Sequence, residues 1–469
     1  MYLFKNQIFA LASVALLGAG CAKTVQPTKP TESYIQKEFK PETSTIAIPV
    51  DIEIEQLTRL VNKNVAGLLY EDNDLNNNNG DNLMLKVSKH SDIKITAQGE
   101  VITYRVPLKI WLKGGFKTES FGMSISHYEE TEFAIALVFS TKVALNQNYG
   151  INTSTSITDH EWIQKPTLKW GPFEIPVNSV VDILIKTQGE KVGPMIDQQA
   201  KAAVNLKKYV NDAWVSLQKP ILVSPEYKTY LKITPSELFM TPLNANNGKF
   251  NATIGIKATT EALISDVAPD ASNTALPNLK LMKSTANQFD IVLAADLPYS
   301  QAKELAKPNL LNKTFTFSDG KKNVTVVGFD MYGSDNKVIV KVDMIGSLKG
   351  TIYLSGVPKY DAATQSIYFD EMDYEMSTKN ALAKSANWLA HDKFVKIMQP
   401  YFKYSIADQL KDSKQMIQKS LTNNKIAQGI VLNGKLADLQ PREIILTNSS
   451  LKAIVDIKGN INVKVEGLD

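Results

Sequence analysis

A seven-residue segment occurs twice in this chain, at Pro235–Thr241 and again at Pro441–Thr447. Both copies begin with proline, carry glutamate at the third position and threonine at the seventh, and place three apolar residues between those two. Each copy also follows a long amphipathic stretch. Because self-similarity of this kind marks a repeated structural unit, we predict that the chain consists of two halves built alike.

The amphipathic stretches are predicted to be long helices. In Val192–Leu217 apolar residues recur at steps of three and four, which places them on one helical face. Trp388–Leu421 carries a comparable stripe, with Pro400 inside it. Proline lacks the amide hydrogen and its ring clashes with the preceding turn, so we expect the second helix to kink or break there.

Most of the remaining chain alternates between apolar and polar residues, the period of half-buried β-strands. The alternation opens each half, at residues 46–54 and 291–297, and in both cases a short helical pattern follows. Gly114-Gly115 is interpreted as a turn that ends the strand 105–113. Strands and helices together predict an α+β fold. The further strand segments are 133–139, 338–344, 352–354 and 372–376.

Four regions follow from these patterns. Residues 1–20 are predicted to be a signal peptide, 21–43 a flexible tether, 44–245 the first helix-plus-sheet domain and 246–469 the second. The segment 269–277, which is rich in proline, is a second position at which the two domains could meet.

The N-terminus reads as a secretory signal because Lys5 precedes a short apolar stretch, which ends in small residues. Cys21, the one cysteine of the chain, follows at once. This arrangement resembles the lipobox of bacterial lipoproteins, although Gly18 stands where that pattern usually has leucine. The resemblance implies lipidation of Cys21, and Ala22 next to it favours the outer membrane. Because no acidic cluster follows Cys21, the periplasmic face of that membrane is expected. The alternative is a cleaved signal with an incidental cysteine.

Composition and motifs exclude several function classes. The formal charge is only +4 and the basic residues are scattered, which argues against nucleic-acid binding. With Cys21 committed to the anchor, no cysteine remains for disulfides, thiol catalysis or a cysteine zinc site. The four histidines stand apart, without metal-site or nucleophile spacing. We therefore expect no metal, no cofactor and no enzyme activity.

Acidic groupings leave one enzymatic alternative open. Glu129–Glu132 and Asp370–Glu375 contain enough carboxylates for glycoside hydrolysis. In the second grouping the acids alternate with apolar residues, so the solvated face of a strand is the favoured interpretation. Asp72 begins a sequence like that of a calcium loop, but Asn77 and Leu83 replace the required glycine and acidic residue.

Several short motifs, taken in order, resemble a bacterial lipoprotein family catalogued as a domain of unknown function. The resemblance spans residues 44–469. The duplicated helix-and-sheet units are also similar to the tubular lipid-binding superfamily, which includes the bactericidal/permeability-increasing proteins. The motifs are Ile48-Pro49-Val50, Trp214 with Pro220-Ile221, Leu231-Lys232-Ile233-Thr234-Pro235, Leu297-Pro298-Tyr299 and Leu439-Gln440-Pro441.

The resemblance implies two tandem tubular domains, each a strongly bent antiparallel sheet wrapped on a long helix. Relatives hold acyl chains in an apolar groove, where each CH₂ removed from water contributes about 0.8 kcal/mol. The expected function is binding or shuttling of a lipid or other amphipathic ligand; the alternative is a scaffold of the envelope that binds no ligand. Candidate lining residues are Ile110, Phe133, Leu137, Phe139, Val340, Ile352 and Met372.

Overall fold

The structure is a computed structural model of the chain. It describes residues 23–32, 40–77, 80, 82–120, 123–170, 173–176, 182, 192–201, 206–386, 389, 391–427 and 429–465. The chain divides into two compact units. Unit 1 combines Leu297–Ile406 and Ile444–Lys452 with the described residues before Phe39. Unit 2 holds Phe39–Asp296, Ala407–Glu443 and the chain from Ala453 onward.

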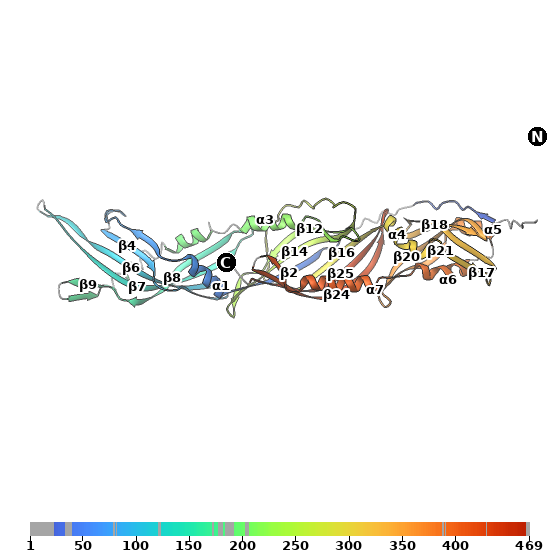
Figure 1. The fold of residues 1–469 in the computed structure, drawn as a ribbon. Helices are drawn as coiled ribbons and strands as arrows, with labels where there is room; N and C mark the ends of the chain where they lie inside the picture. Colours follow the sequence, from blue (N-terminus) through green and yellow to red (C-terminus); the bar gives the residue numbers. More distant parts are fainter. Residues whose placement is uncertain are drawn as a thin grey trace, which may run out of the picture. The chain divides into compact units, whose positions relative to one another are not determined.

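Unit 2 is built around a ten-stranded sheet, called sheet B here (Figure 1). Its order is β11-β12-β14-β16-β2-β25-β24-β23, with β13 added to β14 and β15 to β12. The strands are β2 (Ser44–Glu53), β11 (Ile221–Ser224), β12 (Thr229–Met240), β13 (Asn244–Asn246), β14 (Lys249–Ile264), β15 (Lys280–Leu281), β16 (Phe289–Pro298), β23 (Asn424–Ala427), β24 (Ile430–Leu446) and β25 (Ser450–Val465).

A second sheet of unit 2, sheet C, has the order β3-β4-β6-β7-β8, with β5 on β6. Two of its strands are long, at 20 residues for β6 and 23 for β7. The strands are β3 (Leu68–Asp72), β4 (Leu83–Lys89), β5 (Lys94–Gln98), β6 (Val101–Ser120), β7 (Met123–Leu145) and β8 (Ile151–Gln164); β9 (Thr167–Trp170) and β10 (Phe173–Pro176) pair as a separate hairpin.

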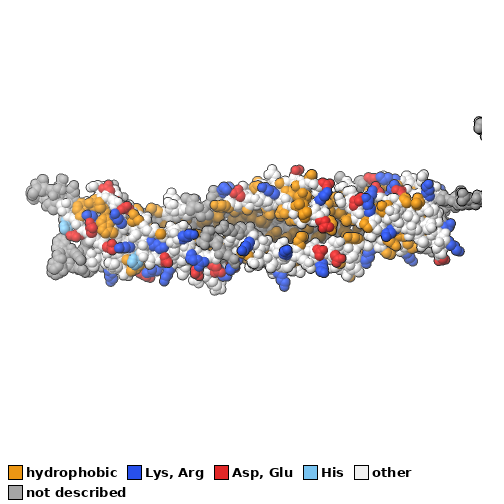
Figure 2. All heavy atoms as spheres, viewed as in Figure 1, with side chains coloured by type: hydrophobic (Ala, Val, Ile, Leu, Met, Phe, Trp, Pro, Cys, Tyr) orange, Lys and Arg blue, Asp and Glu red, His pale blue; other side chains and the backbone are white. Residues whose placement is uncertain are grey.

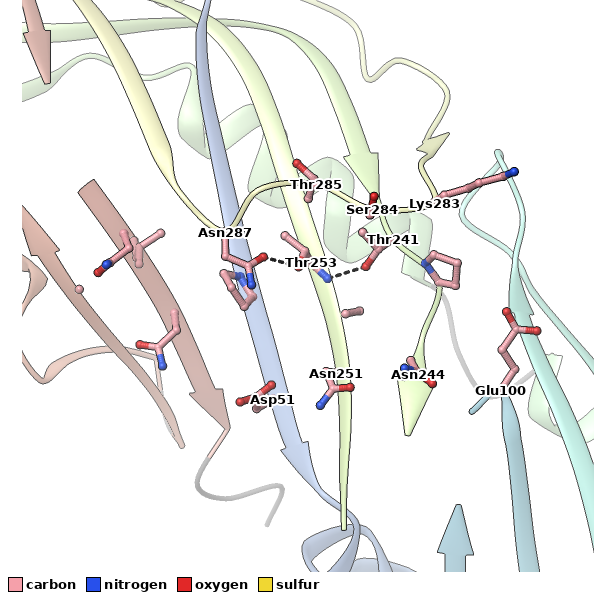
Figure 3. A pocket seen from close by; sticks show the side chains of 17 residues that line it. Asp51, Glu100, Thr241, Asn244, Asn251, Thr253, Lys283, Ser284, Thr285 and Asn287 are labelled. Carbon is pink, nitrogen blue, oxygen red and sulfur yellow. Dashed lines mark hydrogen bonds between the residues drawn. The ribbon is translucent and has the colours of Figure 1, made fainter. Parts of the chain in front are cut away.

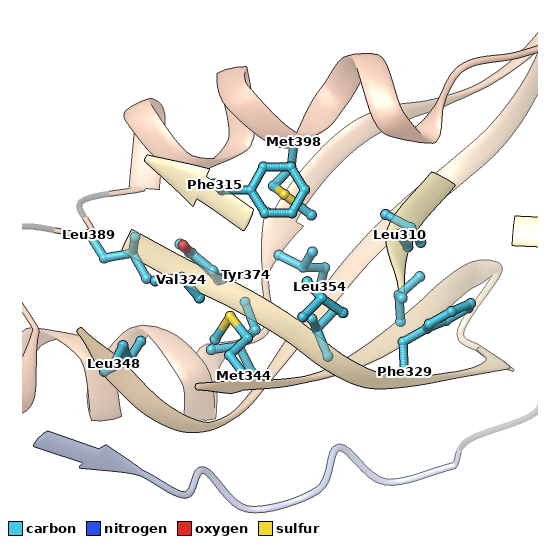
Figure 4. Close-up of a cluster of buried hydrophobic side chains, with 14 of the residues drawn as sticks. Leu310, Phe315, Val324, Phe329, Met344, Leu348, Leu354, Tyr374, Leu389 and Met398 are labelled. Atoms are coloured by element: carbon cyan, nitrogen blue, oxygen red, sulfur yellow. The ribbon is translucent and has the colours of Figure 1, made fainter. Parts of the chain in front are cut away.

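Unit 1 contains sheet A, in which five consecutive antiparallel strands, β17 to β21, are followed by β22. Its apolar side packs into one cluster with helix residues such as Leu310 and Met398 (Figure 4). The strands are β17 (Thr314–Phe317), β18 (Lys322–Ser334), β19 (Lys337–Gly346), β20 (Leu348–Asp361), β21 (Ser366–Tyr374), β22 (Tyr404–Ser405) and β1 (Lys23–Val25), which pairs parallel to β20.

The named α-helices have between 8 and 15 residues, fewer than the two longest strands, β6 and β7. The helices are α1 (Ile54–Asn64), α3 (Leu206–Leu217), α4 (Tyr299–Leu310), α5 (Met376–Ser385), α6 (His391–Met398), the 3₁₀ turn η1 (Gln399–Phe402) and α7 (Ala407–Leu421). Residues 192–201 are also helical, and residues 202–205 before α3 lie outside the described part. Among the helices that the structure describes, none is long and apolar enough to cross a membrane.

The predicted bent sheets are confirmed, but sheet B is not purely antiparallel, since β14 pairs parallel with β16 and β2 with β25. The molecule is mostly β, and the second predicted long helix is not continuous. The second long helix is broken into α6 and α7 by η1 and β22. Pro400 lies in η1, where a residue without an amide hydrogen interrupts the α-helical bonds. The α+β class is therefore replaced by a β-rich fold in which short helices accompany curled sheets.

Gly114-Gly115 is not a turn, and the sequence interpretation was wrong here. Both glycines lie within β6, opposite Glu129 and Tyr128 of β7. A Cβ atom on Gly115 would lie 1.9 Å from the backbone oxygen of His127. Glycine is needed because the two strands approach closely at this point, which allows the long β6–β7 ladder to continue.

The order of elements repeats, in agreement with two halves built alike. The first half runs from β2 and α1 through sheet C and α3 to β11, β12 and β14; the second runs from β16 and α4 through sheet A and α7 to β23, β24 and β25. The predicted boundary at 245/246 falls within β13, whereas the repeat changes over after β14, in the stretch that includes 269–277.

Part of the predicted tether is packed against unit 1. Val25 in β1 is 1% exposed and belongs to the core cluster of that unit. Beyond β1, the backbone oxygens of Thr28 and Thr31 accept hydrogen bonds from Ser377 and Ser334. Residues 23–32 are thus part of unit 1, as a strand added to sheet A and its hydrogen-bonded extension.

Candidate functional site

One side of sheet B, called its inward side here, carries a row of aliphatic side chains, the apolar face. It consists of Ile46, Ile48 and Val50 from β2 and Ile254 and Ile256 from β14. The antiparallel register places Ile48 opposite Ile254 and Ile46 opposite Ile256. Because side chains alternate across a strand, these residues all point to one side of the sheet.

The apolar face is covered at its ends and open between them. Near one end Trp214 of α3 packs with Leu238 and Ile256. Near the other, Leu57 of α1 packs with Phe250 and Ile52. Between these clusters Ile254 is 38% exposed. Figure 2 shows a hollow over sheet B in which hydrophobic side chains gather.

The opposite side of the same strands forms a polar pocket of about 1090 Å³, all within unit 2 (Figure 3). Its floor includes Asp51 of β2 and Asn251 of β14, which are paired across the two strands. Thr253 fixes one wall, because its amide donates to Thr241 Oγ1 at 2.8 Å and its hydroxyl to Asn287 Oδ1 at 3.1 Å. A smaller cavity of about 400 Å³ lies between α7 and β24.

An ion-pair cluster stands on the outer side of sheet B. Glu237 Oε1 lies 3.0 Å from Lys257 Nζ, and its Oε2 lies 3.3 Å from Lys280 Nζ. The hydrogen bond from Lys257 is the main cause that lowers the pKa of Glu237, and the bond from Lys280 adds to it against the opposing effect of burial. The cluster ties β15 to β12 and β14.

The predicted lining residues fall into two separate sets. Ile110, Phe133 and Leu137 come together in a small cluster of sheet C, and the ring of Phe139 stacks on Tyr104 at a centroid distance of 5.2 Å. Val340, Ile352 and Met372 are 1%, 0% and 8% exposed within the core of unit 1. None of the seven lines either described cavity. Cys21 lies outside the described residues.

The acidic groupings form ion pairs at strand surfaces. In the first, Glu130 lies 2.9 Å from Lys113 and Glu132 lies 2.8 Å from Lys109. In the second, Asp370 pairs with Lys359, and Asp373 with Lys379. These contacts agree with the solvated-face interpretation.

The other motifs considered for chemistry are also accounted for. Asp72 Oδ1 accepts the Asp74 amide and the Asn77 side chain, which closes the loop that resembled a calcium site. His160 Nε2 lies 2.8 Å from Asp182. Among the described residues no group of three or more His, Cys, Asp or Glu side chains is placed to hold a metal ion.

Sequence reasoning missed both sides of sheet B as sites. The alternation of Ile46, Ile48 and Val50 predicted the strand, but its partner β14 lies some two hundred positions away. The polar pocket leaves only a weak sequence signal, the alternation of Asn460 and Asn462 in β25. Its other lining residues come from segments far apart in the chain, so no local pattern connects them.

A family model described as "Domain of unknown function (DUF4403)" matches residues 42–465. The chain belongs to this family. The family predicted from the sequence is thereby confirmed. Similar solved structures include a crystal structure of lipopolysaccharide binding protein, with 11% identity, a TM-score of 0.24 and coverage of 91% of this chain and 99% of that one. Another is P47 of Clostridium botulinum E1, with 9% identity, a TM-score of 0.21 and coverage of 90% and 98%. No curated protein matches the chain.

Proposed function

We propose that this protein binds a membrane lipid, whose acyl chain lies along the apolar face of sheet B. The observation that carries the proposal is the partial exposure of Ile254, Ile48 and their neighbours between two packed clusters. The hollow over sheet B in Figure 2 supports it. Aliphatic side chains that remain exposed inside a curled sheet lose hydrophobic stabilisation, and an apolar ligand restores it.

The dimensions of the apolar face suit one acyl chain. From Ile46 to Val50 the strand advances four residues, which at about 3.3 Å each gives roughly 13 Å. An acyl chain in a bilayer occupies about half of the roughly 30 Å hydrocarbon core. With about 0.8 kcal/mol for each CH₂ buried, a chain of that length needs no specific polar contact to be retained.

The proposal has further parts that rest on the sequence. The protein is anchored in the outer membrane through a lipid on Cys21 and faces the periplasm. It binds or shuttles its ligand and catalyses no reaction. Its two halves are two tandem tubular domains. The repeated order of elements supports the last part, because each half contributes matching strands to sheet B.

Native mass spectrometry of the full chain, purified after production in a bacterial envelope, tests the lipid-binding proposal. A bound lipid of defined mass is expected in the wild type. Ile254→Lys places a charge on the apolar face and should abolish loading, whereas Thr259→Lys places the same charge on the other side of β14 and should leave loading unchanged. Equal loading of both variants, or no lipid on the wild type offered phospholipid vesicles, contradicts the proposal.

A scaffold that binds no ligand is the second candidate, and one observation favours it. The core of unit 1 is filled by its own side chains, since Val338, Leu348 and Ile352 are each 0% exposed. A tubular domain packed in this way leaves no space for an acyl chain. If no lipid accompanies the wild type, the scaffold becomes the leading function, and cross-linking in the native envelope would identify its partners.

A further inference from the structure

The polar pocket is separate from the apolar face because the sheet stands between them. Along β2, Val50 points inward while Asp51 points to the pocket, and along β14 the same holds for Ile254 and Thr253. One molecule cannot occupy both sites without passing through the sheet. A ligand of the polar pocket is therefore distinct from the lipid proposed above.

The lining of the pocket is rich in neutral hydrogen-bonding groups. It contains five asparagines, three threonines and one serine among its 17 residues. An amide offers two donors and one acceptor oxygen, and a hydroxyl offers one donor and two acceptor sites. A lining of this kind matches a ligand that carries many hydroxyl groups, each of which both donates and accepts.

Several of these groups have their hydrogen-bonding capacity free for a ligand. Within the described part of the chain, the side chains of Asn244, Asn251 and Asp51 accept or donate no hydrogen bond. These three residues form a row, since Asn251 is paired with Asn244 on one side and with Asp51 on the other. Neighbouring strands are about 4.8 Å apart, so the row presents polar groups at regular spacing across roughly 10 Å.

The charges at the pocket disfavour an anion. Asp51 and Glu100 are both in the lining, and Lys283 is the single basic residue among the lining residues. A phosphate or carboxylate ligand would be repelled by two carboxylates and attracted by one ammonium group, so the lining as a whole disfavours a negative charge. A neutral ligand avoids this cost.

Small apolar surfaces lie between the polar groups. Pro49 and Pro242 contribute them. Sugar rings alternate hydroxyl groups with C–H faces, which suits this mixture. The volume of about 1090 Å³ slightly exceeds the roughly 300–1,000 Å³ common for small-molecule sites, so there is space for several sugar rings.

We infer that the polar pocket of sheet B binds a neutral oligosaccharide. Asn244, Asn251 and Asp51 form the recognition row on the strands, and the wall held by Thr253, Thr241 and Asn287 borders it. The site rests on rigid strands, because β14 is paired on both sides along the pocket.

Isothermal titration calorimetry of the full chain tests this inference with three neutral probes, chitotetraose, maltotetraose and cellotetraose, and one anionic probe, tetragalacturonate. At least one neutral tetramer should bind with a dissociation constant below 1 mM, set here as the criterion, and tetragalacturonate should bind at least tenfold more weakly. Asn251→Ala and Asn244→Ala should each weaken binding tenfold, the loss of roughly one hydrogen bond to a buried ligand. Asn309→Ala, on the exposed side of α4, is the matched control and should have no effect.

Asn244 is exposed, so Asn244→Ala should fold normally and can still test the site if Asn251→Ala unfolds. The inference is overturned if no neutral tetramer binds at millimolar concentration, if both variants bind as tightly as the wild type, or if tetragalacturonate binds best. Lipid loading measured on the same variants should stay unchanged, which separates this site from the apolar face.

Discussion

The ring of Phe239 lies over Gly255 on the outer side of sheet B. A Cβ atom at position 255 would be 1.9 Å from Cζ of that ring, and Phe239 is only 1% exposed. Gly255→Ala should therefore overpack the site and lower the free energy of unfolding by about 1–3 kcal/mol. Urea denaturation measures the change. In the Gly255→Ala, Phe239→Leu double variant the smaller side chain makes room, so the total cost should be less than the sum of the two single costs; simple additivity would refute the contact.

Glu237 should make the stability depend on acid pH. Its pKa is lowered by Lys257 and Lys280, so its ionised form is stabilised in the folded state. That contribution is present above the unfolded pKa of about 4.3 and is lost as the pH falls through the lower folded pKa. Glu237→Gln should cost about 0.5 kcal/mol at pH 7, a value typical of partly exposed ion pairs.

Below pH 4 the difference between Glu237→Gln and the wild type should shrink. Urea unfolding at several pH values measures it, with Glu226→Gln as the control, because Glu226 is exposed and makes no ion pair within the described residues. A difference that stays constant, or grows, as the pH falls would show that the ion pairs do not stabilise the folded state.

At the scale of elements, β1 is expected to be a structural part of unit 1. Val25 is buried in the core of that unit. Gly350, its partner in β20, has φ +137°, and a Cβ atom at position 350 would lie only 1.9 Å from the backbone oxygen of Val25. Val25→Ala should cost about 2 kcal/mol through lost burial. Hydrogen exchange should show the amides of β1 and β20 exchanging faster. Val267→Ala, at a residue that is 72% exposed, should change neither quantity.

Local sequence patterns predicted the individual strands and the helix break well. They did not predict which distant strands pair with each other. The alternation at 46–54 and 338–344 identified β2 and β19, and Pro400 identified the helix break, because both signals depend only on neighbouring residues. Gly114-Gly115 misled because glycine serves close strand approach as well as turns. The apolar face and the polar pocket were missed because each requires β2 to pair with β14, which no local pattern in either strand specifies.

At the scale of the whole molecule, the two units differ in how completely their apolar residues are packed. In unit 1, Ile352 is 0% exposed within a continuous core, while in unit 2 Ile254 is 38% exposed. A filled core has no space for a ligand, so we expect one lipid per chain although the halves repeat. Native mass spectrometry should show one lipid mass added, and two added masses would contradict the asymmetry.

Paired variants extend this prediction to each unit. Ile352→Val should lower the free energy of unfolding by about 0.5–1.5 kcal/mol and leave lipid loading unchanged, because it alters only packed core. Ile254→Lys should abolish loading at little cost in stability, because the lysine side chain can extend from a half-open face into solvent. Loading that falls in Ile352→Val and persists in Ile254→Lys would place the ligand in unit 1 and reverse the assignment.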